Sequence, residues 1–146
     1  MKFLILNGPN LNLLGRREPE IYGKRDYAAL VTFVKECCAS VGAECEVFQT
    51  NHEGVLVDMI QGALETGVDA IIINPAAYTH TSIAIADALR AVEIPAAEVH
   101  LSDINTRETY RHISYAGDAC VATFKGKGFD SYREAIEFMS ARLAEK

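Results

Sequence analysis

Residues 69–74 read DAIIIN, and this short run decides the fold class. Its three isoleucines are β-branched and follow one another without polar alternation, which is typical of a strand covered on both faces. Strands covered in this way belong to parallel sheets that carry helices on both sides. Four other short apolar runs are also predicted to be strands: FLILN (3–7), ECEVFQ (44–49), AAEVHLS (96–102) and ACVATFK (119–125).

Segments of helical period separate the five predicted strands. Their apolar residues recur at spacings of three and four, and Asp26 stands where its side chain can cap the first helix. The apolar stripes consist of Tyr27, Leu30, Val31, Val34 and Val41; of Leu56, Met59, Ile60, Ala63 and Leu64; of Ile85, Leu89 and Val92; and of Tyr132, Ala135, Ile136, Met139 and Leu143.

Strands that alternate with helices along the whole chain predict βαβ units, which form a parallel sheet through right-handed crossovers. No repeat, low-complexity tract or linker interrupts residues 1–146. We therefore expect a single α/β domain with a flavodoxin-like three-layer sandwich, whose five-stranded parallel sheet has the order 2-1-3-4-5.

The composition excludes several classes of protein. With 146 residues, 49% of them hydrophobic and 23% charged, the chain suits one soluble domain with a normal core. No apolar run approaches the roughly 20 residues of a membrane span, and residues 3–6 are too short for the apolar core of a signal peptide. A net charge of −6 argues against a broad nucleic-acid surface. We expect a cytoplasmic protein with neither a membrane nor a nucleic-acid partner.

The cysteines and histidines give no sign of a metal site. Cys37 and Cys38 are adjacent, so both cannot face one zinc ion from a helix, and no pair has C-x-x-C spacing. These two, with Cys45 and Cys120, are predicted to be small buried hydrophobes in a reducing compartment. Because the histidines at 52, 80, 100 and 112 are scattered singly, we expect no metal.

Polar side chains follow three of the predicted strands. The first strand ends in Asn7-Gly8-Pro9-Asn10, the third in the run from Asn74 to His80, and the fourth in the run from Glu98 to Asp103. In an open parallel sheet, ligands bind at the carboxyl ends of the strands where the strand order reverses. Strands one and three flank that point in the proposed order, so the sequence predicts a small-molecule site there.

The first connection, about residues 8–25, is far longer than the roughly 2–6 residues usual between a strand and a helix. Long loops in compact domains are usually lids, binding loops or disordered segments. We interpret the stretch at about 16–25 as a flap at the edge of the site. The turn itself is a poor phosphate cradle, because it has no G-x-G-x-x-G, no Walker lysine, and a proline at position 9.

Each polar residue near the strand ends also has a structural interpretation. Asn10 can be a turn former, and Asn74 can end its strand before a proline. His80 can cap the third helix or bond its backbone. Arg107 and Arg111, four residues apart, would share one face of a helix, either as a solvated face or as an anion site.

Glu98 and His100 differ from these residues because they lie two apart within an apolar run. In a strand this spacing points both side chains to the same side. The carboxylate of Glu98 could therefore orient or charge the imidazole of His100, and a merely structural buried pair is the alternative.

Four blocks of the sequence together resemble type II 3-dehydroquinate dehydratase. They read NGPNLNLLGRREPEIYG from residue 7, NHEG from 51, INPAAYTHTS from 73 and EVHLSDINTRETYRHISY from 98. The resemblance implies a lyase that uses neither metal nor cofactor. It would dehydrate 3-dehydroquinate to 3-dehydroshikimate, in the shikimate pathway or in quinate breakdown.

The resemblance also implies catalytic roles for individual residues. Tyr22 would be the base that removes a proton from C2 of the substrate, and Arg17 would lie near it. His100 would protonate the leaving C1 hydroxyl, with Glu98 orienting it. Asn10 would hold a water molecule that stabilises the enolate.

The remaining roles implied by the resemblance concern binding and assembly. Asn74, His80 and Arg111 would hold the hydroxyls of the substrate, while Ser102 and the backbone N–H groups of Leu101 and Ser102 would hold its carboxylate. Asp87 would reach into the site of a neighbouring subunit, within trimers that assemble into dodecamers. A plain surface acid is the alternative for Asp87.

The chain departs from the family pattern at three positions. The family commonly has Asn, His and Gly where this chain has Asp103, Asn105 and Ser131. Asp103 would add negative charge beside the proposed carboxylate pocket, or point outward. Since neither the proposed acid nor the proposed base is lost, we expect activity.

Other function classes fit the sequence less well than the lyase. A binding module that has lost catalysis would lack the acid or the base, yet Tyr22 and His100 are both present. A hydrolase would use Ser82 or Ser102, but neither lies in G-x-S-x-G. A Schiff-base route would need a lysine near the strand ends, and Lys125 is the nearest candidate.

Overall fold

A parallel sheet forms the centre of the computed structural model, which describes residues 1–16, 20 and 24–146. Its strands are β1 (Lys2–Asn7), β2 (Glu44–Gln49), β3 (Ala70–Asn74), β4 (Ala96–Val99) and β5 (Ala122–Phe124). The order is β2-β1-β3-β4-β5, with every neighbouring pair parallel. The predicted fold class and strand order are therefore confirmed.

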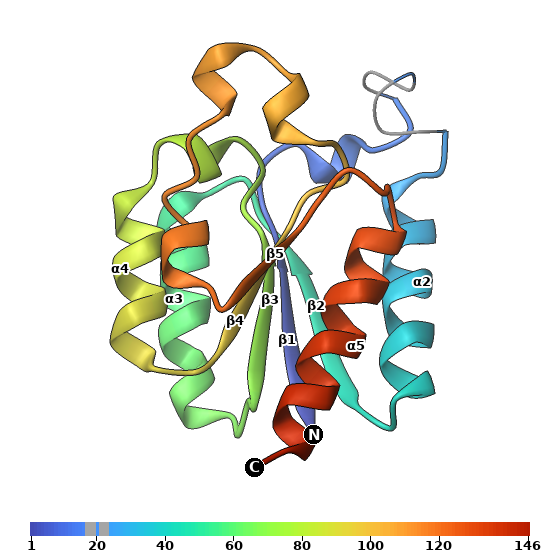
Figure 1. Ribbon diagram of the computed structural model, residues 1–146, viewed down its shortest axis with the longest axis vertical. Helices are drawn as coiled ribbons and strands as arrows, with labels where there is room; N and C mark the ends of the chain where they lie inside the picture. Colours follow the sequence, from blue (N-terminus) through green and yellow to red (C-terminus); the bar gives the residue numbers. More distant parts are fainter. Residues whose placement is uncertain (17–19, 21–23) are drawn as a thin grey trace.

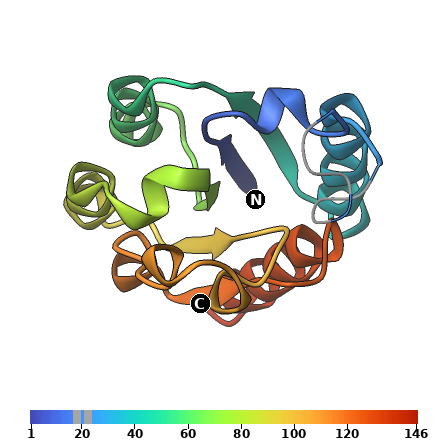
Figure 2. The ribbon, with the colours of Figure 1, turned by 90° about the horizontal axis from the view of Figure 1, so that it is seen from above.

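Helices cover both faces of the sheet. Figures 1 and 2 show α2 (Tyr27–Ser40) and α5 (Asp130–Ala144) on one face, and α3 (Glu53–Gly62) and α4 (Ile83–Val92) on the other. The predicted cap of the first helix is confirmed, because the Ala29 N–H donates to Asp26 Oδ1 at 2.9 Å. No helix in the described part of the chain is both long and apolar enough to cross a membrane.

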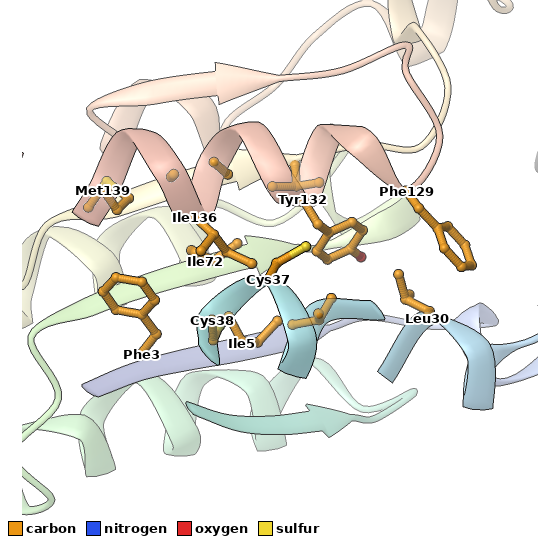
Figure 3. Packing of buried hydrophobic residues seen from close by; sticks show 14 of the residues in the cluster. Phe3, Ile5, Leu30, Cys37, Cys38, Ile72, Phe129, Tyr132, Ile136 and Met139 are labelled. Atoms are coloured by element: carbon orange, nitrogen blue, oxygen red, sulfur yellow. The ribbon is translucent and has the colours of Figure 1, made fainter. Parts of the chain in front are cut away.

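The central strands bury side chains on both faces. Ile72 packs with α2 and α5, whereas Ile71 and Ile73 pack with α3 and α4, and all three are fully buried. Figure 3 shows Ile72 in the first of these layers, with Phe3 and Ile5 of β1. Because each such side chain contributes about 1.5–3 kcal/mol when fully buried, a run of three isoleucines is stable only in a sheet covered twice.

Several predicted boundaries were wrong. Leu64 is 62% exposed, because α3 ends at Gly62 and the 3₁₀ turn Ala63–Glu65 changes the angular spacing of the apolar stripe. The fourth strand ends at Val99, so His100 is the first residue beyond it, although the His100 N–H still donates to Phe124 O at 2.9 Å. The last strand covers only Ala122–Phe124.

The cysteines are free, and two of them are buried as predicted. Cys37 and Cys38 are buried in the layer between the sheet, α2 and α5, while Cys45 and Cys120 are half-buried. Burial raises the pKa of the Cys120 thiol to about 12, so this thiol stays protonated at neutral pH.

Candidate active site

A cavity lies beyond the carboxyl ends of β1, β3 and β4, the strand ends that point to the top of Figure 1. Strand order reverses between β1 and β3, so this is the position expected for a ligand of an open parallel sheet. Seven of the residues to which the resemblance gives a role line the cavity: Asn10, Asn74, His80, His100, Leu101, Ser102 and Arg111.

Two other predicted site residues, Glu98 and Asp87, do not line it within the described part of the chain. Glu98 is fully buried and reaches the cavity only through its contact with His100. Asp87 lies on α4 with a side chain 70% exposed, and its carboxylate is 3.5 Å from Arg90. The remaining two, Tyr22 and Arg17 of the predicted flap, lie outside the described residues.

Glu98 and His100 form a short polar contact at the cavity wall. His100 Nε2 lies 2.6 Å from Glu98 Oε1, and both side chains are buried. The prediction that the two side chains share one side of the chain is confirmed. The contact is possible because the backbone continues in strand-like pairing through His100.

Three hydroxyl groups complete the surroundings of the Glu98 carboxylate. Ser114 Oγ donates to Oε1 at 2.6 Å, Thr123 Oγ1 to Oε2 at 3.0 Å, and Thr79 Oγ1 to Oε1 at 3.5 Å. Burial alone would raise the pKa of Glu98, but the hydrogen bond and charge of His100, then the bonds from Ser114 and Thr123, hold it below its usual value. Glu98 is therefore a carboxylate at neutral pH.

An ionised Glu98 decides the tautomer of His100. A carboxylate only accepts hydrogen bonds, so Nε2 of His100 must carry the proton that it donates to Glu98. Nδ1 is then the ring nitrogen left for chemistry, and His100 lines the cavity.

Gly117 lets the chain pass close to this carboxylate. A Cβ atom at Gly117 would lie 2.4 Å from Glu98 Oε2 and 2.8 Å from Ser114 Oγ. The Gly117 N–H donates to Ser114 Oγ at 2.9 Å, which directs the Ser114 proton toward Glu98. Any side chain at position 117 would therefore displace Glu98 or its partner.

Sequence reasoning missed Ser114, Thr123 and Gly117 as functional residues. Thr123 lies directly opposite Glu98 in the pairing of β4 with β5. The sequence feature that could have indicated this contact is a single threonine in a short apolar strand, next to a strand that contains an acid. Ser114 lay within the fourth resembling block, but no local pattern connects it to a residue sixteen positions earlier.

His80 lines the cavity as a neutral imidazole. Its Nδ1 is 2.8 Å from the backbone oxygen of Ile113, so Nδ1 carries a proton and Nε2 is left as an acceptor. Burial lowers the pKa of His80, and the nearby charges of His100 and Arg111 lower it further, which outweighs the hydrogen bond to Ile113. His80 does not cap the third helix, because Ser82 Oγ accepts from the Ile85 N–H at 3.0 Å.

Two arginines give the cavity local positive charge. Arg111 Nε donates to Glu108 Oε2 at 2.7 Å, and Arg107 Nη1 donates to Ser102 Oγ at 3.4 Å. Their segment is not one helix but two 3₁₀ turns, Ile104–Thr106 and Thr109–Arg111, yet both arginines line the cavity. The overall charge of −6 is therefore compatible with an anionic ligand.

Asn10 is both a turn former and a cavity residue. Its φ of 70° lies in the left-handed region that asparagine tolerates, and its N–H donates to Asn51 Oδ1 at 3.0 Å. Gln49 Nε2 holds the same loop by donating to Gly8 O at 3.2 Å and to Asn51 Oδ1 at 3.1 Å. The two interpretations from sequence are thus compatible.

The departures from the family pattern leave the cavity wall intact. Asp103 Oδ1 accepts from the Asn105 N–H at 3.0 Å and lies 3.8 Å from Lys125 Nζ, so its charge faces a turn and a lysine. Asn105 is exposed. Ser131 is buried and accepts from the Lys127 N–H at 3.1 Å.

Comparison with known proteins identifies the family. The sequence model described as Dehydroquinase class II matches residues 1–140. The chain belongs to the class II dehydroquinase family. It is thus an enzyme, and the resemblance read from four blocks of its sequence is confirmed.

Individual class II dehydroquinases are similar over nearly the whole chain. The 3-dehydroquinate dehydratase of Herminiimonas arsenicoxydans is 49% identical over 140 residues, which is 96% of this chain and 97% of the relative. The catabolic 3-dehydroquinase of Verticillium alfalfae is 49% identical over 145 residues, 99% of this chain and 96% of the relative. The crystal structure of type II dehydroquinase from Butyrivibrio crossotus superposes with a TM-score of 0.93 at 48% identity, covering 95% of this chain and 97% of that one.

Proposed function

We propose that this chain removes water from 3-dehydroquinate to give 3-dehydroshikimate through an enolate, with His100 as general acid and Tyr22 as general base. The family of the chain and the names of its relatives support the substrate. The observation that carries the acid half of the proposal is the buried hydrogen bond between Glu98 and His100 at the cavity wall.

The reaction needs a base at C2 and an acid at C1. Removal of a C2 proton, next to the ketone at C3, leaves an enolate. Its electron pair then forms the C1–C2 double bond while the C1 hydroxyl accepts a proton and leaves as water. The charge of the enolate requires hydrogen-bond donors or a positive charge close to its oxygen.

His100 suits the acid because ionised Glu98 stabilises its imidazolium form. The proton on Nε2 stays on His100, in its hydrogen bond to Glu98, and the proton on Nδ1 is transferred to the leaving hydroxyl. After the transfer His100 is neutral and still donates to Glu98. Glu98 therefore acts as a positioning residue that also favours the charged state of the acid.

Tyr22 is the proposed base on the basis of the family motif. A tyrosine has a pKa near 10, so most of it is protonated at neutral pH. The guanidinium of Arg17 would favour the phenolate, and a shift of ~2 units requires only about 2.7 kcal/mol of differential interaction. A base of that strength suits the working pH better.

The polar cavity residues divide between the parts of the substrate. Ser102 and the backbone N–H groups of Leu101 and Ser102 would hold the carboxylate. Arg107 donates to Ser102 Oγ and adds positive charge on this wall. The hydroxyls would be held by Asn74, His80 and Arg111, and the enolate by a water molecule on Asn10; all of these residues line the cavity.

The assembly is proposed to be a dodecamer built of trimers, in which Asp87 reaches the site of a neighbouring subunit. Asp87 and Ile83 are both exposed on α4, and Ile83 is a large apolar side chain 56% exposed. Light scattering coupled to size-exclusion chromatography tests the assembly. A monomer of 16.0 kDa at micromolar concentration would refute it.

The remaining parts of the proposal are a single catalytic domain over residues 1–146 with a flap at about 16–25, a cytoplasmic location, and a place in the shikimate pathway or in quinate breakdown. One relative is a catabolic enzyme by name and others carry no such word.

Purified protein mixed with 3-dehydroquinate in the presence of a chelator tests the function directly. The conjugated enone of the product absorbs in the ultraviolet, so absorbance should rise with time. His100→Asn, which keeps a polar side chain but cannot deliver the proton, is the matched control and should be slower by about 10²–10⁴-fold. No absorbance change at micromolar wild-type enzyme would refute the dehydratase proposal.

A further inference from the structure

A buried phenol connects three distant parts of the chain and contacts Asn74, which lines the cavity. Tyr132 lies in the first turn of α5 and is fully buried. Its hydroxyl donates to Asn7 Oδ1 at 2.6 Å and accepts from Asn74 Nδ2 at 2.9 Å. Figure 3 shows its side chain extending from α5 into the layer that also holds Ile72 of β3 and Cys37 of α2. Tyr132 therefore joins the ends of β1 and β3, between which the strand order reverses.

One backbone group fixes the direction of every hydrogen bond in this chain of contacts. The Ala76 N–H donates to Asn74 Oδ1 at 3.1 Å, and a backbone N–H can only donate. The Asn74 amide therefore presents its nitrogen to Tyr132. The phenolic oxygen must accept that bond, so its own proton goes to Asn7 Oδ1.

The side-chain amide of Asn74, held by these two hydrogen bonds, can still bind a ligand. An asparagine side chain offers two donor hydrogens and two acceptor lone pairs. The bonds to Tyr132 and Ala76 use one of each, which leaves one N–H and one lone pair in fixed directions. Because Asn74 lines the cavity, these remaining sites suit a ligand with adjacent hydroxyl groups.

The network contains a feature that a purely structural core would avoid. Within the described residues, Asn7 Nδ2 is a buried nitrogen with no hydrogen bond of good geometry, although the Asn7 side chain also interacts with the phenol of Tyr27. An unsatisfied buried group destabilises the fold. Burial raises the pKa of Tyr132 well above its usual value, so the hydroxyl keeps the proton that it donates.

We propose that Tyr132 is a positioning residue for substrate binding: its hydroxyl fixes the orientation of the Asn74 amide, and through that amide the placement of the substrate hydroxyls. The inference rests on the proposed dehydratase function. It adds a residue of α5, which does not line the cavity, to the set that determines substrate affinity.

Tyr132→Phe removes the phenolic oxygen and keeps the buried ring. The KM for 3-dehydroquinate should rise about 5–10-fold, as expected for one lost hydrogen bond that orients a binding group. The kcat should change less than about 3-fold, because binding is weakened equally in the ground and transition states. Tyr27→Phe, which removes a different phenol that interacts with Asn7 and leaves Tyr132 in place, is the matched control and should keep the wild-type KM.

A double-mutant cycle separates orientation from a general loss of packing. In an Asn74→Ala background, Tyr132→Phe should change KM less than about 2-fold, because the amide that it positions is absent. Equal effects of Tyr132→Phe in both backgrounds would overturn the inference, as would a folded Tyr132→Phe with unchanged KM. These ratios are read only with active wild-type enzyme, so an inactive wild type refutes the proposed function instead.

A measurement on unaltered protein covers the case in which Tyr132→Phe does not fold. In ¹⁵N-labelled wild-type enzyme, the side-chain N–H proton of Asn74 that is donated to Tyr132 should be protected from solvent exchange. Exchange of both Asn74 side-chain protons as rapid as that of exposed asparagines such as Asn105 would overturn the inference.

Discussion

Glu98 Oε1 lies 2.6 Å from both His100 Nε2 and Ser114 Oγ, so one buried oxygen accepts a hydrogen bond from the imidazole and another from the hydroxyl. The second oxygen accepts from Thr123 at 3.0 Å. Because the partners of the carboxylate besides His100 are neutral hydroxyl groups, the imidazole is the one hydrogen-bond partner of Glu98 in the described part of the chain that can carry a compensating positive charge. The protonation state of His100 is therefore coupled to how well Glu98 is held.

Replacement of Glu98 by Gln tests this coupling. The neutral amide keeps the size of the side chain but cannot stabilise an imidazolium, so kcat should fall by about 10²-fold or more. Steady-state kinetics with 3-dehydroquinate measures the change. Glu65→Gln, at an exposed position in the turn after α3, should keep the wild-type rate. A Glu98→Gln enzyme within 3-fold of wild type, by the same assay, would remove the coupling from the mechanism.

Ser114→Ala should change how stability depends on pH. The pKa of Glu98 is below its usual value of 4.5 in the folded chain, so the unfolded chain binds the proton more readily. The stability that ionised Glu98 contributes is then fully present at pH values above 4.5, the usual pKa, and is lost as the pH falls through the lower pKa of the folded chain. Removing the Ser114 hydroxyl raises the folded pKa and should lower the free energy of unfolding by about 1–2 kcal/mol at pH 7.

Urea denaturation at pH 7 and at pH 4 checks this prediction, with Ser40→Ala in α2 as the control for loss of a partly buried serine hydroxyl. The difference between Ser114→Ala and wild type should be larger at pH 7 than at pH 4. An equal difference at both values would mean that Ser114 does not act through the ionised carboxylate.

Gly117→Ala should damage the site through one methyl group. Its Cβ would lie 2.4 Å from Glu98 Oε2, so the carboxylate or the backbone must move. We expect the free energy of unfolding to fall by about 1–3 kcal/mol. We also expect kcat to fall roughly 10-fold, because moving a catalytic group by about 1 Å can reduce the rate by that factor or more. Gly62→Ala, at the end of α3 with open space around its Cβ, is the matched control and should keep activity. Equal thermal stability and rate in the two variants would contradict the close approach.

Much of the fold was predictable because burial leaves a local signature. The run at 69–74 lacks polar alternation since β3 is covered on both faces, and the cap at Asp26 needs only residues three apart. The errors lie where geometry is decided by the tertiary structure. Leu64 continues an apolar spacing in sequence, but the helix has already ended at Gly62.

The site was predictable to a similar extent. Strand ends and the four blocks gave the residues that line the cavity, and the spacing of two gave the contact between Glu98 and His100. The partners of Glu98 could not be read from the chain, because Thr123 meets it only through the register of β4 and β5. Tyr132 looked like an ordinary core residue of a helical stripe, since its contacts with Asn7 and Asn74 span 125 and 58 residues.

Exchange of the C2 proton of 3-dehydroquinate with deuterium oxide, followed by NMR, tests the central proposal most directly. The acid and the base act at different atoms, so their loss should separate the two halves of the reaction. His100→Asn should still incorporate deuterium at C2, because Tyr22 can form the enolate, while releasing almost no product. Tyr22→Phe should show neither exchange nor product. Exchange that persists in Tyr22→Phe, or rapid product release by His100→Asn, would contradict the assignment of base and acid.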